Sequence, residues 1–245
     1  MKKGIITAGA LAIVACAVAT YCCAAGHENS SKGTATTETV SEQRTESIAN
    51  AADGKSLVVY FSVPETDGVD ASSGASRILS GGKVMGNTQY VASVIGEATD
   101  SDLFEIKTVH AYPGSHKALI DAAKREIDSN ARPKLATRIE NLKEYDVVFV
   151  GFPNWWYDMP MPLYSFFDEY DFSGKTVVPF CTHGGSRFSD AIKTIRELEP
   201  RATVLDGYSI ARDRVAGSKD GILNWLGKIG MKKNRKVNIA RKSPL

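Results

Sequence analysis

Short polar residues at two separated positions of the sequence could together bind an anion. Ser62 follows the apolar run 57–61, and Gly86-Asn87-Thr88 opens a segment with helical periodicity. The first N–H groups of a helix have no partners within it, and the helix dipole favours negative charge there. The nearest basic residue in sequence, Lys83, lies outside the turn. We therefore expect a phosphate held mainly by N–H and O–H donors; a plain capping turn would give the same pattern.

An aromatic loop offers a surface for a flat ring. Residues 151–162 read GFPNWWYDMPMP, in which Asn154, Trp155, Trp156 and Tyr157 lie between Pro153 and Pro160. The prolines preclude a continuous helix or strand through this stretch. Core packing therefore explains the adjacent tryptophans poorly, whereas aromatic planes at the end of a strand suit stacking.

A second glycine-rich turn follows the apolar run 177–181. It consists of Thr182, His183, Gly184, Gly185 and Ser186, and it precedes another helical segment. Such a turn can present backbone N–H groups and an imidazole to a neighbouring loop. The three loops could therefore form one site if their strands are parallel neighbours.

The elements that must position these loops alternate between short apolar runs and helical patterns. This alternation predicts an α/β fold with a doubly wound parallel sheet of five strands, in the order 2-1-3-4-5, and helices on both faces. In such sheets ligands bind beyond the carboxyl ends of the strands, beside the switch point between strands 1 and 3. The expected strands are 57–61, 103–106, 147–152, 177–181 and 204–210, and the expected helices are 87–98, 116–127, 162–170, 187–198 and 219–229.

The loop after the first strand, 63–85, is unusually long. Loops of this length without secondary structure are uncommon in compact domains and are usually functional or disordered. We expect a mobile flap over the site, with a tolerated surface insertion as the alternative.

Taken together, these segments resemble the flavodoxin family, in its larger bacterial branch. The resemblance covers nearly all of 55–229, and the ordered series of motifs is far more specific than any one of them. The motifs are YFS at 60–62, GNT at 86–88, DLFEI at 102–106, YP at 112–113, NARP at 130–133, GFPNWW at 151–156 and PFCTHGGS at 179–186.

The resemblance implies a flavodoxin-like fold with an FMN site. It places the phosphate on Ser62, Gly86, Asn87 and Thr88, the isoalloxazine against residues 153–157, and the pyrimidine edge near residues 182–186. The apolar faces of the tryptophans would disfavour an anionic reduced flavin relative to water.

The sequence departs from the family pattern at three points. The long loop splits the phosphate motif, so that Ser62 is far from Thr88 in the sequence. Tyr157 stands where relatives often have Gly after the paired Trp, and Gly185 is followed by Ser186-Arg187-Phe188 instead of the common Gly-rich continuation. These changes concern the substrate side more than the cofactor side.

The implied function is an FMN-binding redox protein that carries electrons to a redox partner protein or a small quinone-like acceptor. Two alternatives stay open: an NAD(P)H-dependent FMN quinone reductase, and a non-catalytic tethered binding module. A hydrolase is disfavoured because His183 precedes the candidate nucleophile Ser209, the reverse of the α/β-hydrolase order. The four histidines lack metal-ligand spacing, and we expect His110 and His116 on a loop and a helix surface.

Charge and composition favour an exported domain with flexible ends. Lys2-Lys3 and an apolar run predict a signal peptide or membrane anchor at 1–25, with Cys16 as a candidate lipidation site of a bacterial lipoprotein. A polar, disordered linker is expected at 26–54, the FMN-binding domain at 55–230 and a basic tail at 231–245. The domain has a net charge of −3, so no nucleic-acid partner is expected.

Overall fold

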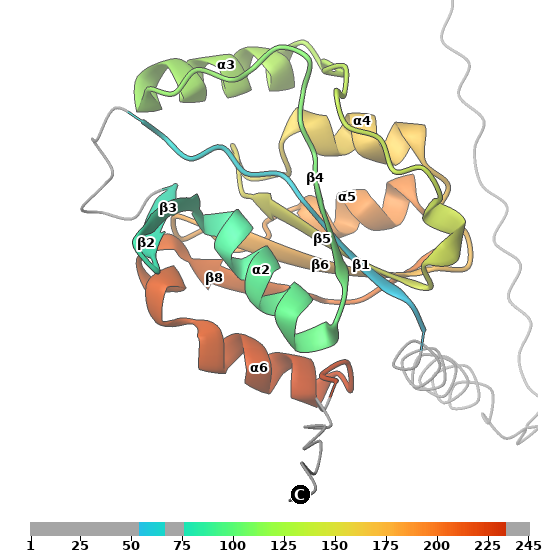
Figure 1. Cartoon of the computed structure of the whole chain (residues 1–245). Helices are drawn as coiled ribbons and strands as arrows, with labels where there is room; N and C mark the ends of the chain where they lie inside the picture. Colours follow the sequence, from blue (N-terminus) through green and yellow to red (C-terminus); the bar gives the residue numbers. More distant parts are fainter. Residues whose placement is uncertain (1–53, 67–75, 234–245) are drawn as a thin grey trace, which may run out of the picture.

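A parallel sheet forms the centre of the computed structural model, which describes residues 54–66 and 76–233 (Figure 1). The strand order is β4-β1-β5-β6-β7, and β8 also pairs with β6. Counted along the chain, this is the predicted order 2-1-3-4-5, with the fifth strand in two pieces. The strands are β1 (Ser56–Tyr60), β4 (Asp102–Glu105), β5 (Val147–Pro153), β6 (Thr176–His183), β7 (Thr203–Val204) and β8 (Tyr208–Ala211).

Helices cover both faces of this sheet, as the sequence predicted. Helices α2 and α6 pack on one face, and α4 and α5 pack on the other. Helix α3 lies on the same side as α4 and farther from the strands (Figure 1). The helices are α2 (Asn87–Thr99), α3 (His116–Asp128), α4 (Met161–Glu169), α5 (Ala191–Leu198) and α6 (Lys219–Lys228), with 3-10 turns η1 (Leu142–Glu144) and η2 (Arg212–Gly217).

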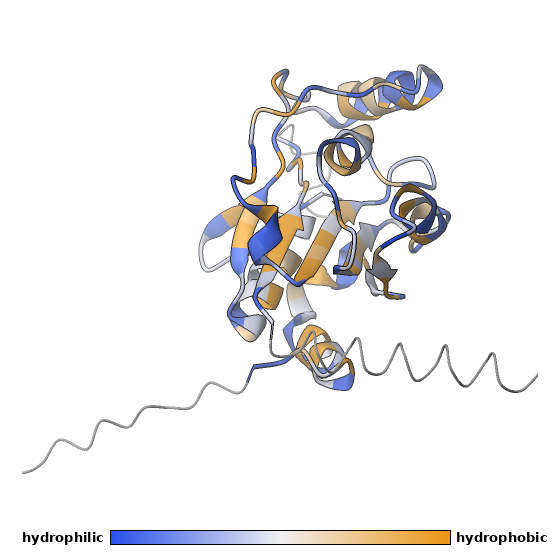
Figure 2. Cartoon of the chain, turned by 90° about the vertical axis from the view of Figure 1, so that its right-hand side faces the viewer, coloured by the Kyte–Doolittle hydropathy of each residue, from blue (hydrophilic) through white to orange (hydrophobic). Residues whose placement is uncertain are grey.

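Alternation along each strand divides the core into two layers. In β1, Leu57 and Val59 face the α4 and α5 layer, whereas Val58 and Tyr60 face α2 and α6. Successive side chains of a strand point to opposite faces, so a strand covered on both sides is apolar throughout. Figure 2 shows this as predominantly hydrophobic central strands.

The fifth strand and one helix differ from their expected bounds. The predicted strand 204–210 is interrupted at Gly207, which has a φ of 73° and lies against the Pro179 carbonyl. The helix expected from residue 187 begins at Ala191, because Arg187 and Ser189 have positive φ angles of 55° and 47°. Left-handed residues cannot continue an α-helix.

The expectation of a structureless loop at 63–85 was wrong over its second half. An antiparallel hairpin, β2 (Arg77–Ser80) and β3 (Lys83–Gly86), leads directly into α2. Its turn residues Gly81 and Gly82 have φ angles of 56° and 77°, as a type I′ turn requires. Residues 67–75 lie outside the described residues, and the predicted flap stays a prediction there.

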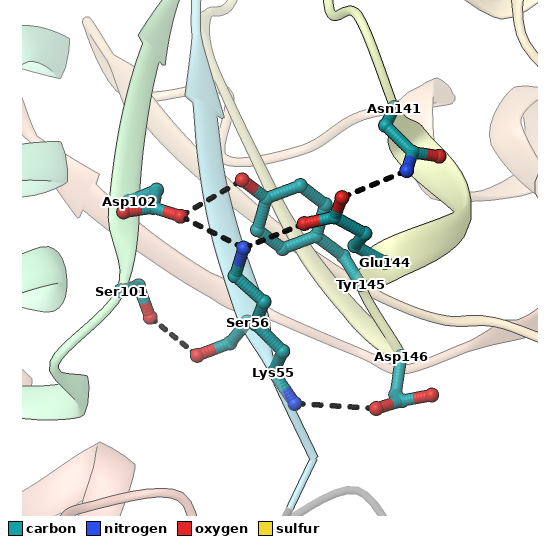
Figure 3. Close-up of polar contacts among 8 residues, drawn as sticks. All are labelled: Lys55, Ser56, Ser101, Asp102, Asn141, Glu144, Tyr145 and Asp146. Carbon is teal, nitrogen blue, oxygen red and sulfur yellow. Dashed lines mark hydrogen bonds and ion pairs between the residues drawn. The ribbon is translucent and has the colours of Figure 1, made fainter.

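A polar network fixes the amino-terminal ends of three neighbouring strands (Figure 3). Lys55 Nζ lies 3.0 Å from Glu144 and 3.6 Å from Asp102, and Asp102 accepts a hydrogen bond from Tyr145 Oη. The Lys55 backbone N–H donates to Asp146. Exposed ion pairs contribute little stability each, and these contacts lie at the edge of the sheet opposite the predicted site.

The terminal predictions concern residues that are almost entirely outside the described part of the chain. These are the signal or anchor at 1–25 with Cys16, the linker at 26–54 and the tail at 231–245. Within residues 54–66 and 76–233, no helix is long and apolar enough to cross a membrane.

Candidate functional site

A cavity of about 680 Å³ opens at the carboxyl ends of β1, β5 and β6. All residues predicted for the site line this cavity except Gly86, which lies directly beside it against Ser62. The structure therefore brings together three loops that are far apart in sequence. The predicted lining residues are Ser62, Asn87, Thr88, Pro153, Asn154, Trp155, Trp156, Tyr157, Thr182, His183, Gly184, Gly185 and Ser186.

The start of α2 forms one end of the cavity. Asn87 and Thr88 are buried, and Thr88 Oγ1 lies 2.8 Å from Thr182 Oγ1 on β6. A side chain at Gly86 would collide with the Ser62 hydroxyl, so the glycine leaves room for that hydroxyl beside the start of α2. One expectation needs correction: the Asn87 N–H donates to the Ser76 carbonyl at 2.9 Å and is not a free donor. Ser76, the residue before β2, therefore occupies the Asn87 N–H.

The aromatic loop folds as a tight turn with an unfavourable backbone. Trp155 and Asp158 exchange backbone hydrogen bonds of 2.9 and 3.1 Å. The two residues between them, Trp156 and Tyr157, have φ angles of 53° and 69°. A turn of this kind normally takes Asn or Gly. The family preference for Gly after the paired Trp therefore has a physical cause, and Tyr157 occupies a left-handed position that costs about 1 kcal/mol or more.

The two tryptophans have different surroundings. Trp155 packs edge-on against Phe61 and Tyr112, with ring centroids 5.5 and 5.4 Å away. Trp156 is 48% exposed, and its indole N–H donates to the Ile120 carbonyl on α3 at 3.4 Å. Trp155 is thus held by the core, whereas Trp156 joins the turn to α3.

Asn154 braces the aromatic turn. Its amide nitrogen donates to the Arg187 carbonyl at 2.9 Å, and its amide oxygen accepts the Tyr157 N–H at 3.2 Å. Its own backbone N–H donates to the Thr182 carbonyl. Asn154 therefore positions the loops after β5 and β6 relative to each other.

The surroundings of His183 favour its neutral form. Burial is the main cause that lowers its pKa; the positive charge of Arg187 adds to the effect, and Asp213 opposes it. The Gly185 N–H donates to Nδ1 at 2.9 Å. The neutral imidazole therefore carries its proton on Nε2, as a hydrogen-bond donor.

The structure adds lining residues that were not predicted, most of them from the loop after β1 and from α3. His116, expected on a helix surface, contacts the buried Glu65 carboxylate, with Nδ1 to Oε1 at 2.7 Å. The additional lining residues are Val63, Glu65, Ser76, His116, Leu119, Ile120, Ala123 and Arg212. The helix expected at 116–127 was the sequence signal for the α3 group. Within residues 54–66 and 76–233, no cluster of three potential metal ligands is present.

A comparison with protein families identifies the family of this chain. The flavodoxin family model matches residues 79–229. A comparison with curated proteins finds no match. A predicted flavoprotein from Bacteroides uniformis ATCC 8492 is 30% identical, with a TM-score of 0.55 over 71% of this chain and 98% of that one.

Two other solved structures are similar. A predicted flavoprotein from Bacteroides eggerthii DSM 20697 is 26% identical, with a TM-score of 0.56 over 72% of this chain and 98% of that one. A flavoprotein from Lactobacillus acidophilus NCFM, solved in complex with FMN, is 21% identical, with a TM-score of 0.47 over 68% of this chain and 99% of that one. The family match covers more than half of the chain, and the chain therefore belongs to the flavodoxin family.

Proposed function

We propose that this domain binds FMN noncovalently and carries electrons to a partner protein or a small quinone-like acceptor. FMN is the cofactor that membership in the flavodoxin family indicates. The observation that carries the proposal is that the turn 86–88, the aromatic turn 153–157 and the glycine-rich turn 182–186 meet around one cavity.

The chemistry of the lining groups fits this cofactor. The α2 start offers hydroxyls from Ser62 and Thr88 and the positive end of a helix dipole to the phosphate. Gly86 keeps the backbone close to Ser62, where any larger residue would intrude. Trp156 and Tyr157 supply partly exposed aromatic faces for the ring.

The bound flavin would supply the electron chemistry, and the protein would bind, orient and shield it. Trp155, locked against Phe61 and Tyr112, gives the cavity a rigid apolar wall. His183 presents a neutral imidazole with a proton on Nε2, so it can donate a hydrogen bond without adding charge.

A quinone reductase is the second candidate, favoured by one observation. Helix α3 contributes the apolar side chains Leu119, Ile120 and Ala123 to the cavity, next to Trp156. Such a wall suits a small planar acceptor bound beside the flavin.

Anaerobic reduction separates these candidates. The FMN-loaded protein is titrated with dithionite and then, in a second experiment, mixed rapidly with NADPH. A carrier shows stepwise one-electron reduction and reacts slowly with NADPH. A reductase is reduced rapidly by NADPH in one two-electron step. Bound FMN that neither reagent reduces would contradict both and support a non-catalytic binding module.

We further propose that the amino-terminal segment tethers the domain to a membrane. Lys2-Lys3, the apolar run and the polar linker in the sequence support this. Fractionation of the full chain should place it with membranes. Soluble cytoplasmic protein would contradict the proposal, and a Cys16→Ser variant that stays attached would indicate an uncleaved helix instead of a lipid.

A further inference from the structure

Strand register places one guanidinium group beside the glycine-rich turn of the cavity. Strand β8 runs parallel to β6, with Ala211 paired to His183. The next residues on the two strands, Arg212 and Gly184, are therefore neighbours. A Cβ built on Gly184 would lie 4.0 Å from the Arg212 guanidinium carbon, and both residues line the cavity.

Arg212 carries a positive charge that no described carboxylate neutralises directly. Among residues 54–66 and 76–233, it makes no ion pair. The adjacent Asp213 acts on His183, but it is exposed, so solvent and salt weaken its charge. The one carboxylate among the described lining residues, Glu65, contacts His116.

Arg212 lies beside the turn that should face the ring of the cofactor. Gly184 lies two residues beyond Thr182, whose hydroxyl contacts Thr88 at the phosphate end. Two-electron reduction of a flavin with uptake of one proton leaves one negative charge on the pyrimidine side of the ring. A guanidinium beside such a charge stabilises it, and more so where the cavity walls exclude part of the solvent.

We infer that the charge of Arg212 stabilises the anionic, two-electron-reduced cofactor at the turn 182–186. This rests on the proposed FMN binding. It reverses the expectation drawn from the tryptophans alone, because the apolar walls are joined by a cation that the sequence did not place in the site.

The test compares charge-removing variants with charge-preserving ones. Arg212→Gln and Arg212→Met remove the charge, and Arg212→Lys keeps it. Arg214→Gln is the matched control, because Arg214 belongs to the same 3-10 turn but is exposed and does not line the cavity. The two-electron midpoint potential is measured by anaerobic titration with dithionite against a reference dye, with FMN and separately with riboflavin bound.

Both neutral variants should weaken binding of the reduced form relative to the oxidised form at least ten-fold, which lowers the midpoint potential by about 30 mV. The shift should be the same with riboflavin. Sulfite, which bonds to the oxidised ring and leaves it negatively charged, should bind at least ten-fold more weakly. Arg212→Lys and Arg214→Gln should behave like the wild type.

Unchanged potential and sulfite affinity in folded Arg212→Gln or Arg212→Met would overturn the inference. So would a loss of FMN affinity with riboflavin affinity preserved, which would place Arg212 at the phosphate. A wild-type protein that binds no flavin would overturn the proposed function itself, and the inference with it. The two failures are thus distinguishable.

Discussion

The hydroxyl oxygens of Thr88 and Thr182 lie 2.8 Å apart, although 94 residues separate them in the chain. This contact joins the first turn of α2 to the carboxyl end of β6, and both side chains are buried. It links the expected phosphate end of the cavity to the turn that should face the ring. Removal of either hydroxyl should therefore lower the affinity for the cofactor.

Thr88→Val keeps the shape of the side chain and removes its hydroxyl. We expect a loss of about 1–3 kcal/mol in the free energy of unfolding, because the buried Thr182 hydroxyl loses its partner. We also expect FMN affinity to fall more than riboflavin affinity. Calorimetry with both ligands measures this, and Thr88→Ser, which restores a hydroxyl, is the control. Equal FMN affinity in Thr88→Val and wild type would contradict the assignment.

Gly86→Ala should disturb the close contact between Ser62, which follows β1, and the start of α2. The new methyl group would collide with the Ser62 hydroxyl, so this hydroxyl must rotate away from the position that it holds beside α2. We expect FMN affinity to fall at least ten-fold and stability to fall by about 1–3 kcal/mol. Gly217→Ala is the control, because a methyl group there meets open space. If fluorescence titration finds the same FMN affinity in both variants and in the wild type, the assignment of Gly86 to the phosphate site is wrong.

Tyr157→Gly should relax the aromatic turn. The φ angle of 69° is easily adopted by glycine and strained for tyrosine. We expect the free energy of unfolding to rise by up to about 1 kcal/mol in urea denaturation. Tyr157→Ala removes the same ring but keeps the Cβ, so it should bring no such gain. A destabilised Tyr157→Gly protein would show that the exposed ring contributes more than the strain costs.

The low pKa of His183 predicts a specific pH dependence. Because its pKa is lower in the folded state than in the unfolded chain, the unfolded state binds more protons below about pH 6.5. The stability contributed by the neutral ring is therefore present above that pH, and it is lost as the pH falls through the folded-state pKa. Urea denaturation from pH 8 to 5 should show a steeper decline for wild type than for His183→Asn.

Asparagine can still accept the Gly185 N–H but does not titrate. Both proteins keep His116 and its contact with Glu65, so the difference between them isolates His183. Parallel curves for the two proteins would contradict the prediction.

Periodicity and spacing predicted most of the fold because the central strands are apolar on both faces. The sheet order, the five helices and the meeting of three loops all follow from the alternation of elements. The hairpin β2–β3 was missed, although Gly81-Gly82 between Ile78-Leu79 and Val84-Met85 is a recognisable turn signal. The break at Gly207 depends on its contact with the Pro179 carbonyl, which no local pattern reveals.

The unpredicted part of the site depends on tertiary structure. Arg212 enters the cavity through the register of β8 on β6, and Glu65 meets His116 only because the loop after β1 packs on the start of α3. The backbone contact between Thr66 and Gly114 fixes that packing. Neither relationship leaves a motif in the sequence.

Isothermal titration calorimetry of the purified domain with FMN and with riboflavin tests the central claim most directly. We predict one FMN per chain, with riboflavin bound at least ten-fold more weakly because it lacks the phosphate that the α2 start should hold. A protein that binds neither ligand would contradict the account of the cavity. Equal affinity for both would contradict the phosphate site.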